Sequence, residues 1–299
     1  MRAFIFPGQG SQYSGMNRKI PGAPVVRELF DRASGVLGFD LWALVDAGGD
    51  AVLVQTQNTQ PALFVTEVAW IKALAARGIT CDVAAGHSLG EFTALYAAGV
   101  FTFDDGVRLV QRRGEIMASA VQNCPGTMAA IIGLTDGELL QVLEVGRSFG
   151  IVEAANYNTP QQTVISGETV AVDHAVSAVK ELGKGRAVRL RVGAPFHSSI
   201  MASGADQFAD FLRGVPFSRP NFPVINNVAA AVDEDPEVIR ANLVAQFKSP
   251  VQWVDTICKC SAMGVGEYLE VGPRNALTNM VRQMVSGGAG VHAVEEESW

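Results

Sequence analysis

One serine stands in a motif that is typical of nucleophilic catalysis. Ser88 is the central residue of a G-x-S-x-G sequence at 86–90, between a predicted strand at 82–85 and a predicted helix at 89–98. A sharp strand-to-helix turn holds such a serine exposed and strained, and the two glycines let the strand and the helix approach each other. A G-x-S-x-G also arises by chance in a glycine-rich chain, but this context favours a nucleophile. The amide of Leu89 would then point at a developing oxyanion.

A serine nucleophile needs a general base, and the chain has four histidines. His87 adjoins the serine and points elsewhere if the turn is tight. His174 lies on a predicted surface helix, where a solvated side chain is expected, and His292 is near the C-terminal end. His197 lies in a loop at 194–199, and loops on a rigid scaffold commonly carry catalytic groups. Elimination therefore predicts His197 as the base.

An arginine on the predicted helix at 102–119 is expected to face the interior. Arg113 shares one stripe with Leu109 and Ile116 by i, i+4, i+7 spacing, whereas the opposite stripe carries Arg112 and Glu115. An inward guanidinium stays charged and requires a partner. That partner is either an acidic side chain in a structural salt bridge or a substrate carboxylate held by two parallel hydrogen bonds.

Alternating strands and helices along most of the chain predict an α/β fold with a largely parallel sheet. A helix is predicted at 61–77, with Pro61 in its first turn. Three strands (128–132, 162–166, 187–192) and two helices (136–146, 170–182) fit a small ferredoxin-like insert. We therefore expect an α/β-hydrolase-like catalytic domain at 1–126 and 196–299, with a ferredoxin-like small subdomain at 127–195.

The composition argues against several classes of protein. A formal net charge of −7 disfavours nucleic acid as the main partner, because phosphate binding needs a basic face. No apolar run is long enough for a signal peptide or a membrane span. Four cysteines, Cys81, Cys124, Cys258 and Cys260, lack the spacing of a zinc site. We expect reduced thiols, a cytoplasmic protein, and no metal or redox cofactor.

Seven segments occur here in the order in which a known family carries them: 6–12, 59–62, 86–91, 111–114, 196–198, 249–253 and 270–273. On these motifs the chain resembles the malonyl-CoA:acyl-carrier-protein transacylases, including the free-standing acyltransferases of polyketide assembly lines. The resemblance covers nearly the whole chain, and the combination of motifs is highly specific.

The resemblance implies a catalytic dyad of Ser88 and His197. It implies an oxyanion hole formed by the amides of Gln9 and Leu89, and a histidine oriented by the main-chain carbonyl of Gln246. The implied reaction is a ping-pong transfer of a malonyl group from malonyl-CoA to the phosphopantetheine thiol of an acyl carrier protein, in fatty acid or polyketide synthesis. An acyl-serine intermediate links its two halves.

On the substrate side, the resemblance assigns Arg113 to the malonyl carboxylate, and Gln60 and Asn156 match positions that line the family's cleft. The bulk of Phe196, next to the base, is expected to crowd an α-methyl group such as that of methylmalonyl-CoA. A serine hydrolase or thioesterase that acts on carrier-protein or CoA thioesters remains the alternative. It would use the same histidine and the same nucleophile elbow, which is the turn at 86–90 that carries Ser88.

Five basic residues lie within twelve positions of this acidic chain: Lys180, Lys184, Arg186, Arg189 and Arg191. They lead directly toward His197, so they are a candidate landing site for an acidic carrier protein or for the phosphates of coenzyme A. The alternative is an exposed edge strand that its charges keep soluble.

Overall fold

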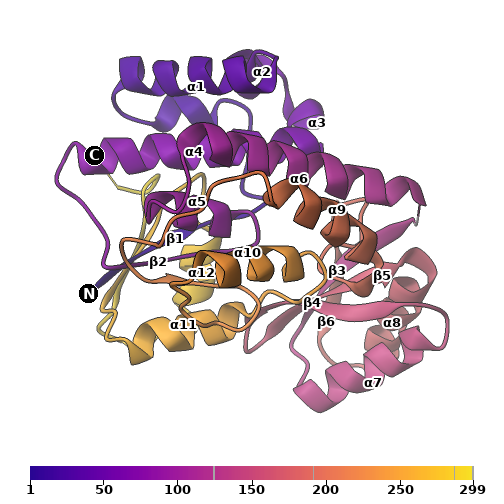
Figure 1. Ribbon diagram of the computed structural model, residues 1–299. Coiled ribbons are helices and arrows are strands. Elements are labelled where there is room, and N and C mark those ends of the chain that lie inside the picture. Colours follow the sequence, from indigo (N-terminus) through magenta and orange to yellow (C-terminus); the bar gives the residue numbers. More distant parts are fainter. Residues whose placement is uncertain (124, 191, 286, 298–299) are drawn as a thin grey trace.

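The structure is a computed structural model that describes residues 1–123, 125–190, 192–285 and 287–297 (Figure 1). Within these residues the strands form a five-stranded sheet, in the order β7-β2-β1-β8-β9, and a four-stranded sheet, in the order β4-β5-β3-β6. The first sheet consists of β1 (Arg2–Phe6), β2 (Val83–Gly86), β7 (Val224–Ile225), β8 (Glu267–Glu270) and β9 (Gly290–Ala293). The second consists of β3 (Gly126–Ile132), β4 (Val152–Thr159), β5 (Gln162–Glu168) and β6 (Arg186–Arg189).

Every pairing in the five-stranded sheet is parallel, as the alternating pattern predicts. Successive side chains of β1 point to opposite faces. Phe4 and Phe6 therefore enter the larger core, while Ala3 and Ile5 enter a second core on the other face. The sheet is thus covered by helices on both sides, which explains why β1 is apolar from Ala3 to Phe6 and β2 carries no polar side chain.

The helices that surround this sheet come from both halves of the chain. They are α1 (Ala23–Leu37), α2 (Leu41–Ala47), α3 (Asp50–Leu53), α4 (Thr56–Ala75), α5 (Gly90–Ala97), α6 (Phe103–Asn123), α9 (Ala202–Leu212), α10 (Pro236–Ala245), α11 (Trp253–Ala262) and α12 (Ala276–Val281), with 3₁₀ turns η1 (Met16–Lys19) and η2 (Ser199–Met201). Thr102 caps α6, because its hydroxyl accepts a hydrogen bond from the amide of Asp105. Helices α4 and α6 lie side by side (Figure 1).

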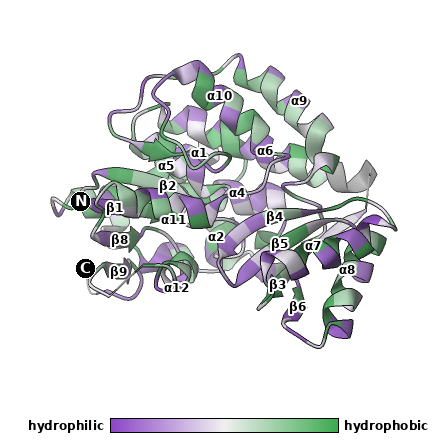
Figure 2. Ribbon diagram, turned by 90° about the horizontal axis from the view of Figure 1, so that it is seen from below, coloured by the Kyte–Doolittle hydropathy of each residue, from purple (hydrophilic) through white to green (hydrophobic). Residues whose placement is uncertain are grey.

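The four-stranded sheet is antiparallel and carries α7 (Asp136–Arg147) and α8 (Thr169–Glu181) on one face. Its β-α-β-β-α-β order is the ferredoxin-like arrangement. Figure 2 shows this sheet and its helices at one end of the molecule, with the N-terminus, β1 and β9 at the other. The predicted fold class is confirmed, whereas the boundaries at 126/127 and 195/196 stay a prediction.

The insert has four strands instead of the three predicted, and the strand that was not predicted is β4. Its pairing with β5 is irregular between Ala154 and Asn156 and again between Tyr157 and Thr159. Each irregularity shifts the inward-facing positions by one residue, so the strand lacks the regular alternation by which a strand is recognised.

The predicted start of the helix at Pro61 is wrong, because α4 begins at Thr56 and places Pro61 inside the helix. Asn58 and Thr59 tie the first turn down, since their side chains donate to the carbonyls of Val52 and Leu53. Because these residues are polar, the sequence pattern of the first turn resembles that of a loop. Among the described residues, no helix has both the length and the apolar character that crossing a membrane requires.

Candidate active site

Ser88 lies on a sharp turn between β2 and α5, with a positive φ of 54°. A side chain at Gly86 would meet the carbonyl of Gly90 at 2.0 Å, and one at Gly90 would meet the carbonyl of Phe6 at 2.1 Å. Only glycine fits at either position, so the two residues let β1, β2 and α5 converge at the serine. Positive φ is uncommon for residues other than glycine and is found at functional turns.

His197 meets Ser88 across 109 positions of sequence, with Nε2 2.8 Å from the serine Oγ. The other ring nitrogen, Nδ1, lies 2.8 Å from the main-chain carbonyl of Gln246. A carbonyl can only accept, so Nδ1 carries the proton, and Nε2 of the neutral ring is free to accept from the serine hydroxyl. His197 also has a positive φ, of 58°. The structure therefore brings the predicted pair together in the orientation that a general base requires.

Burial keeps this imidazole neutral. Burial, together with the nearby charge of Arg113, lowers the pKa of His197 to about 3, against the opposing hydrogen bond to Gln246. Because the pKa lies below the ordinary histidine value of 6.5, the ring stays unprotonated at neutral pH and can take a proton.

We expect the NMR signals of the His197 ring to show a neutral imidazole at pH 5, where an ordinary histidine is mostly protonated. A depressed pKa moves the uptake of the proton to lower pH, so no midpoint should occur near 6.5. The signals are assigned by their loss in His197→Gln. A midpoint between pH 6 and 7 would show that the ring is solvated and would contradict the burial argument.

The amides of Gln9 and Leu89 face no acceptor within the described part of the chain. The turn that carries Gln9 packs against the elbow, since a side chain at Gly8 would meet the carbonyl of His87 at 2.5 Å. The side chain of Gln9 is itself held by a hydrogen bond to Thr56. Two free N–H groups beside the nucleophile are what an oxyanion requires.

Arg113 is 1% exposed, and its guanidinium reaches Ser88: Nη2 donates to Ser88 Oγ at 3.1 Å. The same nitrogen donates to Gln246 Oε1 at 2.8 Å, and Nη1 donates to Gln60 Oε1 at 3.0 Å. Nε is buried without a partner. No ion pair joins Arg113 to an acid in the residues described, so the cation is held by neutral oxygens. Although burial lowers the pKa of Arg113 to about 9, the group is charged at neutral pH.

Gln60 and Gln246, two predicted site residues, thus both hold this arginine. The predicted stripe on α6 is confirmed, since Leu109 and Ile116 are buried with Arg113. Asn156 lies in β4, where its backbone forms a β-bridge with Val251. Its side chain forms no hydrogen bond with a described residue. Phe196 is buried in the larger core and precedes His197 in the chain. The substrate-contact roles of Asn156 and Phe196 stay predictions.

Two residues around the elbow were given no role by the sequence analysis. Asn227 accepts from the Ser88 amide at 2.6 Å and donates to the Gly86 carbonyl at 2.6 Å, so it bridges the turn. Glu91, on α5, accepts from Gln246 Nε2 at 2.5 Å and from the Asn227 amide at 3.1 Å. Glu91 could have been predicted, because a glutamate among the apolar side chains that surround it in α5 calls for a buried partner. Asn227 offered no such signal, because it follows a strand of only two residues.

The other histidines take no part in this cluster. His87 donates from Nε2 to Asn158 Oδ1 at 2.9 Å, and its ring packs against Trp253, so it does point away from Ser88. His174 is half-buried and stacks on Phe149, which corrects the expectation of a solvated side chain. The ring stack arises because the turn after α7 lies over α8.

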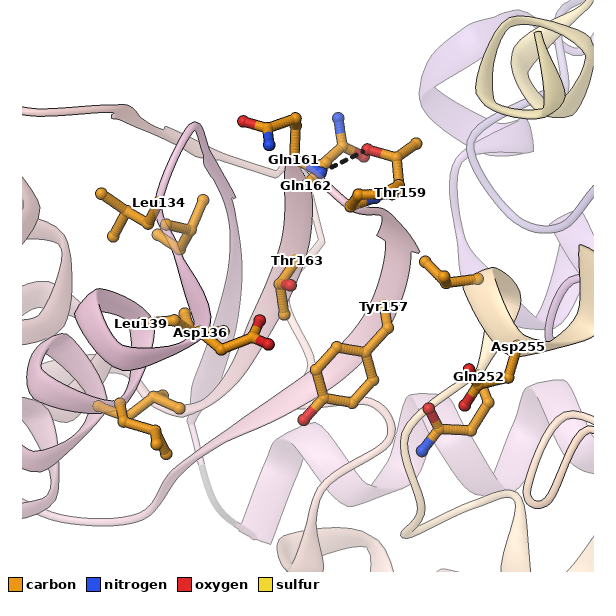
Figure 3. Close-up of a pocket in the computed structure, with 15 residues that line it drawn as sticks. Leu134, Asp136, Leu139, Tyr157, Thr159, Gln161, Gln162, Thr163, Gln252 and Asp255 are labelled. Atoms are coloured by element: carbon orange, nitrogen blue, oxygen red, sulfur yellow. Dashed lines mark hydrogen bonds between the residues drawn. The ribbon is translucent and has the colours of Figure 1, made fainter. Parts of the chain in front are cut away.

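Two cavities lie near these elements. The first has a volume of about 630 Å³ and opens onto the turn that carries Gln9. It is lined by Gln9, residues 54–57, Glu115, Ala118, Ser119 and residues 192–194. Figure 3 shows the second, of about 540 Å³, between the leucines of the 134–143 region and Tyr157, Gln252 and Asp255. Ser88 and Arg113 line neither cavity, and the first is the one that reaches a predicted site residue, Gln9.

Comparison with known proteins agrees with this geometry. The acyl transferase domain family matches residues 3–295. The chain is 42% identical over 285 residues to the malonyl CoA-acyl carrier protein transacylase of Escherichia coli K12, covering 95% of this chain and 92% of that protein. It is 40% identical over 284 residues to the same-named protein of Bacillus subtilis 168, covering 94% and 90%.

Solved structures match as closely. The acyl carrier protein S-malonyltransferase of Vibrio cholerae superposes with a TM-score of 0.93 at 40% identity, covering 98% of this chain and 96% of the other. A malonyl-transacylase solved in complex with a type II polyketide synthase acyl-carrier protein superposes with a TM-score of 0.92 at 41% identity, covering 98% and 94%. The matched region includes the elbow, the histidine loop and the arginine helix, and the chain therefore belongs to the acyl transferase domain family.

Proposed function

We propose that this chain transfers a malonyl group from malonyl-CoA to the phosphopantetheine thiol of an acyl carrier protein, through an acyl-Ser88 intermediate. The observation that carries the proposal is Arg113, a buried cation without an acidic partner in the described residues, 3.1 Å from the serine oxygen. A substrate carboxylate would supply the missing partner. The matched relatives, which are named malonyl transacylases, support the same substrate.

The first half-reaction follows from the hydrogen bonds at Ser88. The serine oxygen attacks the thioester carbonyl while its proton moves to Nε2 of His197. The carbonyl oxygen becomes an oxyanion that the amides of Gln9 and Leu89 stabilise. The C–S bond then breaks, and the departing sulfur of coenzyme A takes the proton from His197. In the second half-reaction the carrier thiol gives its proton to His197 and attacks the acyl-serine carbonyl; the C–O bond to Ser88 then breaks, and the serine oxygen takes the proton back from His197.

The hydrolase alternative differs in the orientation of the base. The Ser-His-Asp arrangement of many hydrolases holds the histidine with a buried carboxylate. Here Nδ1 of His197 donates to a main-chain carbonyl. An assay with malonyl-CoA and a carrier protein that bears phosphopantetheine measures both products, and we expect malonyl-carrier to form faster than free malonate. Release of malonate at an equal or greater rate would favour the hydrolase and contradict the transferase.

We further propose that the basic residues of α8 and β6 help to dock the acidic carrier protein. Lys184 is already paired with Glu138, and Arg189 with Asp173. Lys180 and Arg186 are both exposed, and neither forms an ion pair with another described residue. Arg191 lies outside the described residues. The two unpaired cations are therefore the available ones.

In the same assay, Arg186→Glu should raise the KM for the carrier by ~3-fold or more, because a charge at the rim of an interface mainly affects association. Loading of Ser88 from malonyl-CoA should not change. Lys259→Glu makes the same charge reversal on α11, where Lys259 is exposed, and serves as the matched control. Equal effects of the two variants, or none, would remove this surface from the docking site.

A further inference from the structure

Glu91 is a buried carboxylate, 2% exposed, one turn along α5 from the nucleophile. Its Oε2 accepts two hydrogen bonds, from Gln246 Nε2 at 2.5 Å and from the Asn227 amide at 3.1 Å. Both donors are N–H groups, so this oxygen acts as an acceptor in either protonation state of the carboxyl group. In the transfer reaction described above Glu91 has no part, and a buried carboxyl group with well-placed partners calls for an explanation.

The Gln246 amide connects Glu91 to the arginine. Its nitrogen donates to Glu91 Oε2 and, at 3.1 Å, to the carbonyl of Ser88, while its oxygen accepts from Arg113 Nη2 at 2.8 Å. The bond to Glu91 is the shortest of the three. Without it, only the longer bonds to the Ser88 carbonyl and, at 3.5 Å, to Asn227 Oδ1 would hold the nitrogen end of the amide, and the oxygen end that faces Arg113 would be held less firmly.

Arg113 has few other restraints. Gln60 holds Nη1, and the rings of Phe92 and Phe247 lie 5.4 and 5.5 Å from the guanidinium carbon. Stacked rings restrict the plane of a guanidinium but leave it free to turn within that plane. The amide oxygen of Gln246, together with Gln60 at Nη1, therefore sets the angle at which Nη2 meets the serine and any bound carboxylate, and a bidentate pair depends on that angle.

We propose that Glu91 is a positioning residue that selects the acyl group: acting through the Gln246 amide, it fixes Arg113 in the orientation that binds a substrate carboxylate. The inference rests on the proposed function, and it assigns to Glu91 an effect on specificity instead of a step in the chemistry. The required property is an acceptor oxygen at the position of Oε2. A negative charge is not required, since the guanidinium remains charged without it.

The experiment compares the loading of Ser88 from malonyl-CoA and from acetyl-CoA, which has no carboxylate. Glu91→Met keeps the approximate size but removes the acceptor, and we expect the malonyl-to-acetyl ratio of kcat/KM to fall by ~10-fold or more, the usual loss for a displaced charge-assisted pair. Both rates should also share a common loss, because the Asn227 amide loses its acceptor too. Glu91→Gln retains an acceptor oxygen and should keep the ratio within about twofold of the wild-type value.

Glu67→Met is the matched control. Glu67 is also fully buried and accepts a hydrogen bond from Thr93, and among the described residues it forms no hydrogen bond with Gln246, Gln60 or Arg113, so its loss should affect stability without changing the ratio. A second check is the Arg113→Ala background, where Glu91→Met should leave the ratio unaltered, because its effect passes through the missing guanidinium.

Three outcomes would overturn the inference: an unchanged ratio in folded Glu91→Met, an equal fall in Glu91→Gln, or an equal fall in Glu67→Met. If Glu91→Met does not fold, Glu91→Asp withdraws the oxygens by one methylene, and the same fall is expected. A wild-type chain that loads acetyl as fast as malonyl would instead reject the proposed function, and the inference with it. A wild-type preference that survives the loss of the acceptor rejects the inference alone.

Discussion

Ser88→Ala should abolish the covalent adduct that malonyl-CoA forms with the protein, and His197→Ala should slow its formation by ~10²- to 10⁴-fold. His197 and Arg113 both form hydrogen bonds with the serine oxygen, and the turn at 86–90 positions it. The alanine variant keeps these groups but has no nucleophile. The histidine variant keeps the serine, but the proton must leave to water. Intact-mass analysis over time measures both effects, as one malonyl mass added per chain.

Ser199→Ala is the control for the covalent assignment, because Ser199 is an exposed serine two residues from the base. It should acquire the malonyl mass at the wild-type rate. The assignment of the elbow fails if Ser88→Ala gains the adduct as fast as the wild type. Retention of full rate in His197→Ala would instead show that another group accepts the proton, and the depressed pKa of this ring would then lack a catalytic role.

Arg113→Ala should reverse the preference between acyl groups. A charge-assisted pair in a desolvated site is worth ~2–5 kcal/mol, so malonyl loading should fall by tens- to thousands-fold. Acetyl-CoA offers the guanidinium no carboxylate, and in that complex the wild-type cation is buried with neutral oxygens alone. Removal of the cation should therefore raise acetyl loading in absolute terms. The measurement is the loading rate of Ser88 from each donor.

The control for this prediction lies on the same helix. Arg112 is partly exposed and pairs with Glu115, so Arg112→Ala removes an arginine without emptying the site. Both loading rates should stay near the wild-type values. A structural Arg113 would give a different pattern: malonyl and acetyl rates would fall together, and the melting temperature would drop. That pattern would leave malonyl selectivity without a structural basis.

The parts of the site that the sequence revealed are those with a local signature. The elbow of Ser88 has glycines at fixed distances, and the stripe of Arg113 has a helical period that separates it from Arg112 on the same helix. Both signals depend only on neighbours within a few residues. His197 required elimination among four histidines, because the loop that carries it has no period, and only the fold brings it to the serine.

What the sequence concealed depends on long-range contacts. Asn227 bridges the elbow from 139 positions away, and asparagine after a strand has an ordinary role in turns. Glu91 stands within a recognised motif, yet its partner Gln246 is 155 positions distant. β4 and the first turn of α4 were not predicted for a different reason. The irregular pairing of β4 breaks its alternation of side chains, and polar residues interrupt the helical period at the start of α4.

The order of strands in the main sheet has a consequence for folding. β1 lies between β2 and β8, in register with residues 83–86 on one side and 267–270 on the other, and it leads into the turn that carries Gln9. Contacts between positions so far apart form late, because a long loop must close before they stabilise the chain. β1 can pair with β2 as soon as residues 83–86 are present, but its other edge stays open until residues 267–270 join the sheet. The strand that leads to Gln9 therefore acquires both of its neighbours only in a chain that extends to residue 270.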